Sequence, residues 1–321
     1  MTDSSMKYLT EKTKTSFAIA GIALLCSACV SGPDDRQPEA IEAANNALSN
    51  GVSNYDKSKY ELATSYFKNA LRDFRSIDHQ YGIASSSLNL SKTYLSLGDI
   101  EIAEAYLKQA RRIIQRDNIN RLNDHLRIIE SSIAIENKHL AQAKETLAPL
   151  LENNSNNAFT IAAIQNRTRI AHAEMSADKS EAIQWTNNFE QKLKATSNQL
   201  QKARLARFKA NLNDDSETQN KYFAEALNIY RSQTNRPGIA ATLQEWADAL
   251  IMQQPEVAAD KLQRALYIRQ SLQDRKNCLK ILNSFSRISD SSKTKTWTEK
   301  LQNQQFKQWD EFVAAFNQFP N

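Results

Sequence analysis

A sequence pattern that returns about every 40 residues constrains this chain more than any other feature. In the stretch DKSKYELATSYFKNALRDF, Ala63 is followed four residues later by Phe67 and three residues after that by Ala70. Residues three and four apart lie on one face of an α-helix. The same spacing returns at Ala103, Leu107 and Ala110, at Ala143, Leu147 and Leu150, and at Ala258, Leu262 and Ala265. The chain is therefore predicted to be an array of helices that repeat one packing surface.

Each of these helices is preceded by a second amphipathic segment. Two such segments, YGIASSSLNLSKTYLSLGD (81–99) and PGIAATLQEWADALIMQQP (237–255), align at the tripeptide Gly-Ile-Ala. Apolar residues recur in both at steps of three and four, as in an amphipathic helix. Glycine and proline number only six each in 321 residues, which favours a mostly helical protein with short connections. The repeating unit is therefore predicted to be a pair of helices.

The pattern resembles the tetratricopeptide repeat, in which antiparallel helices pair and small residues stand where they cross. The matching residues are Gly51, Tyr60, Ala63, Phe67 and Ala70 in one unit, and Tyr94, Gly98, Ala103 and Ala110 in the next. Helices whose axes lie about 8–10 Å apart need such small side chains at their contact. The resemblance covers residues 40 to 275 and weakens in the third to fifth units, where Thr186 and Gln219 replace apolar or small residues.

This resemblance implies an all-α, right-handed superhelical α-solenoid of about six tetratricopeptide-like helix pairs of roughly 40 residues, over residues 40–275. The predicted units lie near 44–77, 84–117, 124–157, 163–196, 200–233 and 239–272. Residues 276–321 are expected to form C-terminal capping helices. Phe306, Trp309, Val313 and Phe316 predict the last helix, near 294–319, which either covers the final repeat or forms an arm that docks on a partner.

By the same resemblance, the first helix of each unit lines a concave face that binds a protein or peptide. Arginines on such a face can bind carboxylates with two hydrogen bonds, although a simply solvated polar surface is the alternative. The Lys and Asn pattern of the carboxylate clamp found in some chaperone-binding relatives is not met in two consecutive units. Six polar residues project towards this face in the predicted register: Asn89, Lys92, His125, Arg167, Glu174 and Arg204.

The first 28 residues have the pattern of a secretory signal peptide. A head with three lysines precedes the apolar run 17–25, which is shorter than the roughly 20 residues that a membrane-spanning helix needs. The run ends in Cys-Ser-Ala-Cys, which resembles the lipobox of bacterial lipoproteins, although Cys26 stands where that family prefers Leu. Two other interpretations stay open: an ordinary signal peptide with an incidental cysteine, and a C-x-x-C metal or redox pair.

The lipobox resemblance implies cleavage before Cys29 and acylation of that cysteine, so residues 29–39 would form an acylated tether. Val30 follows Cys29 where inner-membrane lipoproteins tend to carry Asp, which favours the periplasmic face of the outer membrane. Cys278 would be the remaining thiol of the mature chain, and its helix-like, apolar surroundings indicate a small buried hydrophobic residue rather than a nucleophile.

Charge and motifs favour a binding protein without chemistry. The formal net charge is +5, and no basic run interleaves with aromatic residues, so nucleic acid is not an expected partner. The sequence has no phosphate-binding glycine loop and no HExxH, and its four histidines lie far apart, so neither a cofactor nor a metal is expected. We expect a membrane-anchored periplasmic adaptor in cell-envelope assembly or maintenance. The alternative is a small-ligand receptor or an enzyme that uses the groove.

Overall fold

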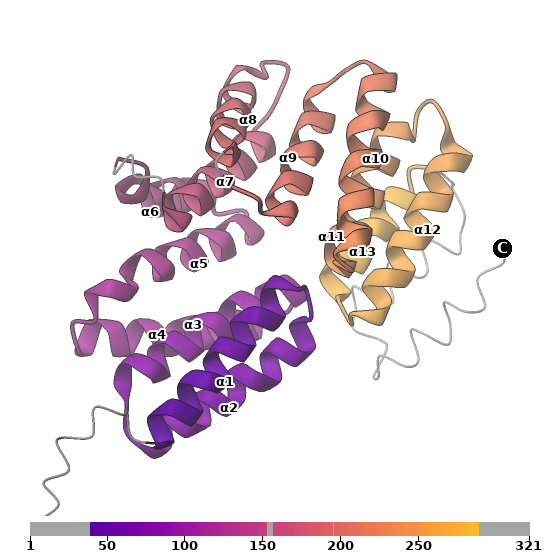
Figure 1. Cartoon of the computed structure of the whole chain (residues 1–321). Helices are drawn as coiled ribbons and strands as arrows, with labels where there is room; N and C mark the ends of the chain where they lie inside the picture. Colours follow the sequence, from indigo (N-terminus) through magenta and orange to yellow (C-terminus); the bar gives the residue numbers. More distant parts are fainter. Residues whose placement is uncertain (1–38, 153–156, 195, 289–321) are drawn as a thin grey trace, which may run out of the picture. The chain divides into compact units, whose positions relative to one another are not determined.

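A computed structural model describes residues 39–152, 157–194 and 196–288. These residues form thirteen α-helices and one short 3-10 helix, with no β-strand among them (Figure 1). The helices are α1 (Glu39–Asp56), α2 (Tyr60–Ser76), α3 (Gln80–Leu97), α4 (Ile100–Arg116), η1 (Asn120–Leu122), α5 (Asn123–Glu136), α6 (Leu140–Glu152), α7 (Ala158–Ala173), α8 (Ser180–Leu193), α9 (Gln199–Leu212), α10 (Ser216–Ser232), α11 (Arg236–Leu250), α12 (Pro255–Ser271) and α13 (Arg275–Phe285).

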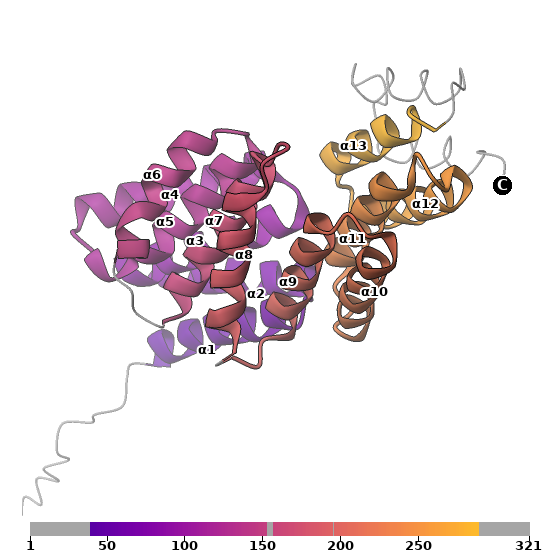
Figure 2. The ribbon, with the colours of Figure 1, turned by 90° about the horizontal axis from the view of Figure 1, so that it is seen from above.

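The α-helices from α1 to α12 pack in six consecutive pairs, each formed by an odd-numbered first helix and an even-numbered second helix. Figure 2 shows α13 following the last pair, and it packs against α12. The predicted all-α solenoid of six helix pairs, closed by a capping helix, is therefore confirmed. The second capping helix, predicted near 294–319, and Cys29 both lie outside the described residues. Among the described helices, none combines the length and apolar composition that crossing a membrane requires.

Small residues at the repeat positions let neighbouring helices approach closely. Ala63 and Ala70 of α2 are fully buried on either side of the Phe67 ring. On the first helices, glycine has the same purpose: a methyl group on Gly82 would overlap the Phe74 ring, and one on Gly238 would overlap the Tyr230 ring. A large side chain from a second helix thus fills the space beside the next first helix, as in the dense interiors of folded proteins.

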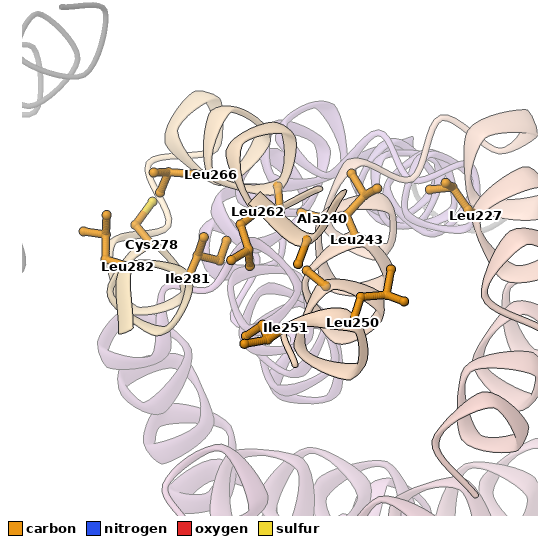
Figure 3. Packing of buried hydrophobic residues seen from close by; sticks show 13 residues of the cluster. Leu227, Ala240, Leu243, Leu250, Ile251, Leu262, Leu266, Cys278, Ile281 and Leu282 are labelled. Carbon is orange, nitrogen blue, oxygen red and sulfur yellow. The ribbon is translucent and has the colours of Figure 1, made fainter. Parts of the chain in front are cut away.

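The sixth pair and α13 share one apolar cluster. Figure 3 shows Leu243 and Leu250 of α11, Leu262 of α12 and Ile281 of α13 among its thirteen buried residues. Burial of a leucine or isoleucine side chain contributes roughly 1.5–3 kcal/mol, so this cluster holds α13 on the array. Cys278 lies in the same cluster and is fully buried, as the sequence predicted, and burial raises the pKa of its thiol.

The connections between helices are short because most of them turn through a residue in the left-handed region. Left-handed backbone places the chain in position for the next helix and is usually a glycine conformation. Here Gly98 is the glycine example, with φ of 90°, and polar or charged residues take the other positions among the described residues. The non-glycine residues with positive φ are Ser58, Asp78, Asn118, Lys138, Thr234 and Gln273. Low glycine content and tight turns are therefore compatible in this chain.

Units far apart along the sequence also touch. The Asn235 side-chain amide, before α11, donates to Ser58 Oγ at 2.9 Å and to Tyr60 Oη at 3.0 Å in the first pair, across 177 and 175 residues. Lys276 Nζ of α13 donates to the backbone carbonyl of Glu136 at 2.7 Å. In a simple repeat array each unit contacts only its neighbours, so these bonds are additional to the repeat packing.

Candidate partner-binding face

Polar and charged side chains of the first helices and of α13 form one electrostatically connected group. We call it the polar first-helix face. Its residues interact with one another across helices through ion pairs, hydrogen bonds or mutual charge effects on pKa. They are Tyr55 and Asp56 of α1, Lys92 of α3, His125 and Glu136 of α5, Gln165 and Arg169 of α7, Arg204 and Arg207 of α9, Glu245 of α11, and Lys276 and Lys280 of α13.

Lys92 occupies one end of this face, beside α1. Its ammonium lies 4.2 Å from the centroid of the Tyr55 ring, and the Tyr55 hydroxyl is 2.9 Å from Ser96 Oγ one turn further along α3. Burial lowers the pKa of Lys92, and the charge of Arg204 lowers it further, while Asp56 opposes the change. Because this ammonium is partly buried and lies near a second cation, an anionic ligand would stabilise its charged form more than it would stabilise that of an exposed lysine.

His125 lies near Lys92 on the next first helix. Burial, and then the charge of Lys92, lower the pKa of this imidazole to about 3. Its ring is 6.0 Å from the Phe159 ring, centroid to centroid. His125 is therefore neutral at neutral pH and adds hydrogen-bonding capacity to the face without adding charge.

Arg204 of α9 completes this end of the face. Its guanidinium Nη1 donates to Gln165 Oε1 of α7 at 3.0 Å. Among the described residues, neither Arg204 nor Lys92 forms an ion pair with a carboxylate. Their helices are separated by several units along the chain, yet the charge of Arg204 is close enough to lower the pKa of Lys92. The two side chains therefore add two positive charges to the face, and the nearby Asp56 carboxylate, which acts on Lys92, forms an ion pair with neither of them among the described residues.

Glu136, the last residue of α5, is a carboxylate of the face. Arg169 Nη2 is 2.8 Å from its Oε1, and the Nζ atoms of Lys276 and Lys280 are each 3.9 Å from its Oε2. Burial alone would raise the pKa of Glu136, but the charges of Arg169, Lys280 and Lys276 outweigh it and lower the pKa. This carboxylate stays ionised at neutral pH and connects α5, α7 and α13.

Arg207 and Glu245 form a second fixed pair on the face. Arg207 Nε donates to Glu245 Oε2 at 3.0 Å, and its Nη2 donates to Oε1, which makes the pair bidentate. Asn211 Nδ2 also donates to Glu245 Oε2 at 3.2 Å. Burial would lower the pKa of Arg207, but the Glu245 carboxylate outweighs it and raises the pKa. The guanidinium and the carboxylate already satisfy each other's hydrogen-bonding groups. A ligand would therefore not readily displace either side chain from the pair.

The face as a whole carries more positive than negative charge. Its cations are Lys92, Arg169, Arg204, Arg207, Lys276 and Lys280, and its carboxylates are Asp56, Glu136 and Glu245. The three-charge excess favours an anionic ligand. Among the described residues no group of three or more His, Cys, Asp or Glu side chains is arranged to hold a metal ion.

The structure distributes the six predicted site residues differently. Lys92, His125 and Arg204 come together on the polar first-helix face. Asn89 lies one turn before Lys92 on α3, and its amide donates to the Ser85 carbonyl of its own helix at 2.9 Å. The other two residues form ion pairs with second helices: Arg167 with Glu181 of α8, and Glu174 with Lys144 of α6 at 2.7 Å.

The predicted register missed the fixed ion pairs of the face. Arg207 and Glu245 lie 38 residues apart, and Arg204 and Gln165 lie 39 apart, close to one repeat. Residues at equivalent positions of successive first helices therefore lie side by side. The signal that would have revealed these pairs is complementary side-chain chemistry at an offset of one repeat.

Comparison with known proteins agrees with this architecture. The tetratricopeptide-repeat family profile matches residues 39–116, which are the helices α1 to α4. A search of curated proteins finds no match. The later pairs repeat the same packing of a first helix on a second helix. The described chain is therefore an all-α, tetratricopeptide-like solenoid, a fold whose repeats generally mediate protein–protein interaction.

Proposed function

We propose that this protein is a non-catalytic adaptor that binds an acidic segment of a partner protein on its polar first-helix face. The observation that carries the proposal is that Lys92 and Arg204 are two cations close enough for the charge of one to act on the other, and neither forms an ion pair among the described residues, although the Asp56 charge also acts on Lys92. Carboxylates of a partner would supply further counter-charge. Hydrogen bonds to a charged group contribute about 1.5–3 kcal/mol each, enough to select an acidic segment.

The repeat fold supports a protein as the ligand. Repeats of this type generally act as interaction scaffolds, and the matched units α1 to α4 contribute Tyr55, Asp56 and Lys92 to the face. The neutral His125 and the amide of Gln165 add hydrogen-bonding groups for a peptide backbone. An acidic segment on this face would thus find charge recognition at Lys92 and Arg204 and neutral contacts around them.

We further propose that the chain is a lipoprotein, anchored through Cys29 to the periplasmic face of the outer membrane. The support is in the sequence: a basic head, the apolar run 17–25, and small residues before Cys29. Two or more acyl chains give stable membrane attachment, whereas one gives marginal attachment. The adaptor would then hold its partner at the cell envelope, in envelope assembly or maintenance.

Co-purification after brief crosslinking tests the partner-binding proposal. The tagged protein, extracted in mild detergent, is compared with a Lys92→Glu/Arg204→Glu variant and with Lys108→Glu/Lys221→Glu, which makes the same charge change at exposed positions of α4 and α10. We expect a defined partner with the wild type and with the exposed-site control, and its loss from the first variant. Equal recovery from both variants would place the partner elsewhere on the molecule.

A Cys29→Ser form tests the anchor separately. We expect the wild-type mature chain to carry the mass of acyl groups at its first residue and to sediment with outer membranes. The Cys29→Ser form should lose both properties while keeping its helical circular dichroism spectrum. An unmodified wild-type cysteine would refute the anchor without bearing on partner binding.

A further inference from the structure

An apolar pocket with a cationic rim lies between α10, α11 and α12, and its lining shares no residue with the polar first-helix face. Its volume is about 440 Å³. Ile239 and Leu243 of α11 and Ile268 of α12 form its apolar lining, and Leu243 is only 1% exposed. In Figure 3, Leu243 lies between Leu227 of α10 and Leu262 of α12.

The rim of this pocket is positively charged. Arg231 of α10 and Arg264 of α12 both contribute to the lining, and none of the lining residues is acidic. Lys261 lies close by: the charges of Arg264 and Arg231 both lower its pKa, after the larger effect of burial. Arg264 has Asp260 as an ion-pair partner at 3.0 Å, with both side chains about half exposed, so the pair is weak.

The size of the pocket indicates what can occupy it. Ligand pockets usually measure about 300–1,000 Å³, and a cavity of about 150 Å³ accepts one benzene ring. The pocket at α10–α12 therefore has room for more than one aromatic side chain. Tyr267 borders it and is 63% exposed.

We propose that this pocket binds a single-chain amphiphile with one anionic head group, a fatty carboxylate or an alkyl phosphate. The alkyl chain would lie on Ile239, Leu243 and Ile268, and the head group would lie between Arg231 and Arg264. Tyr267 would cover the chain from the solvent side. The proposal is independent of partner binding at Lys92 and Arg204, because the two sites share no residue.

Calorimetric titration with three ten-carbon probes below their micelle concentrations tests the pocket. Decanoate and decyl phosphate carry the anionic head, and decanol has the same chain without a charge. The mature chain is compared with Arg231→Gln/Arg264→Gln and with Arg72→Gln/Arg75→Gln, a pair of exposed arginines on α2 that gives the same change in net charge. A Tyr267→Ala variant removes an exposed side chain and leaves the buried core intact.

We expect saturable binding of at least one anionic probe, weakened tenfold or more by Arg231→Gln/Arg264→Gln and unchanged by the α2 control. The stronger of decanoate and decyl phosphate identifies the head group. Tyr267→Ala should weaken decanol and the anionic probe by a similar factor. The proposal is overturned if neither anionic probe binds, if the rim variant binds as tightly as wild type, or if the α2 control weakens binding equally.

Discussion

The contact between Asn235 and the first helix pair gives the most specific prediction about stability. The Asn235 side chain is 3% exposed and forms hydrogen bonds through both its oxygen and its nitrogen. Its Oδ1 accepts from the Gly238 backbone amide at 2.7 Å and caps α11, while its amide donates to Ser58 Oγ at 2.9 Å and Tyr60 Oη at 3.0 Å. Asn235→Ala removes all three hydrogen bonds and leaves two buried hydroxyls without this donor.

The magnitude follows from these contacts. A lost N-cap costs about 1 kcal/mol, and each lost buried hydrogen bond costs a further ~1 kcal/mol. We therefore expect Asn235→Ala to lower the free energy of unfolding by about 3 kcal/mol. Asn198 caps α9 through the same kind of bond, to the Gln201 amide at 3.1 Å, and is exposed. Asn198→Ala should therefore cost only about 1 kcal/mol.

Urea unfolding followed by circular dichroism measures both variants. The difference between them, about 2 kcal/mol, isolates the long-range bonds from the cap. A double-mutant cycle with Tyr60→Phe should recover a coupling of about 1 kcal/mol between the two residues. If Asn235→Ala costs no more than Asn198→Ala, the contact between the sixth and first pairs contributes nothing to stability, and the reasoning fails.

Three further predictions address the core, the histidines and a turn. Phe67→Ala should lower the free energy of unfolding by about 3–5 kcal/mol, because the ring is 1% exposed and packs on Gly51. A decrease below about 1 kcal/mol, measured by urea unfolding, would contradict this packing. Burial lowers the pKa of His125 to about 3 and of His172 to about 4, below the usual value of about 6.5. The two buried, neutral imidazoles therefore contribute fully to stability above about pH 6.5, and this contribution is lost progressively as the pH falls towards their pKa values in the folded protein. We expect the urea midpoint to drop between about pH 7 and pH 4. The drop should be smaller in a His125→Gln/His172→Gln variant. Thr234 has φ of 51°, which a β-branched residue rarely adopts, so Thr234→Asn should raise the free energy of unfolding by up to about 1 kcal/mol; a decrease would show that the threonine side chain is needed there.

The repeat pattern was sufficient to predict the helix pairs. The spacing of Ala63, Phe67 and Ala70 indicates which face of α2 is buried, and burial of that face requires a partner helix on each side. The apolar pattern within one helix therefore predicts that it packs against its sequence neighbours. The same argument applies to each unit of the array. The closing contacts between Asn235 and Tyr60 have no such local signature, because they depend on how small rotations accumulate over several units.

The composition of the polar first-helix face was only partly predictable for a related reason. Arg167 and Arg169 lie two residues apart on α7, which places them about 200° apart around the helix axis. Arg169 pairs with Glu136 on the face, whereas Arg167 pairs with Glu181 of the second helix. At this spacing, a shift of the register by two residues exchanges one arginine for the other. In the strongly patterned second unit, Lys92 was expected on the concave face, and in the structure its ammonium lies over the Tyr55 ring of α1.

The bonds from Asn235 to Ser58 and Tyr60 also bear on how such a gene can change. Repeat arrays commonly grow or shrink by duplication or loss of whole units, since each interface is the same. Here the addition or removal of one unit between the second and fifth pairs would move Asn235 away from its acceptors and leave its buried amide without these two hydrogen bonds. A change in the number of repeats would therefore lower stability through the loss of these bonds, so we expect natural variants of this chain to differ in surface residues far more often than in repeat number.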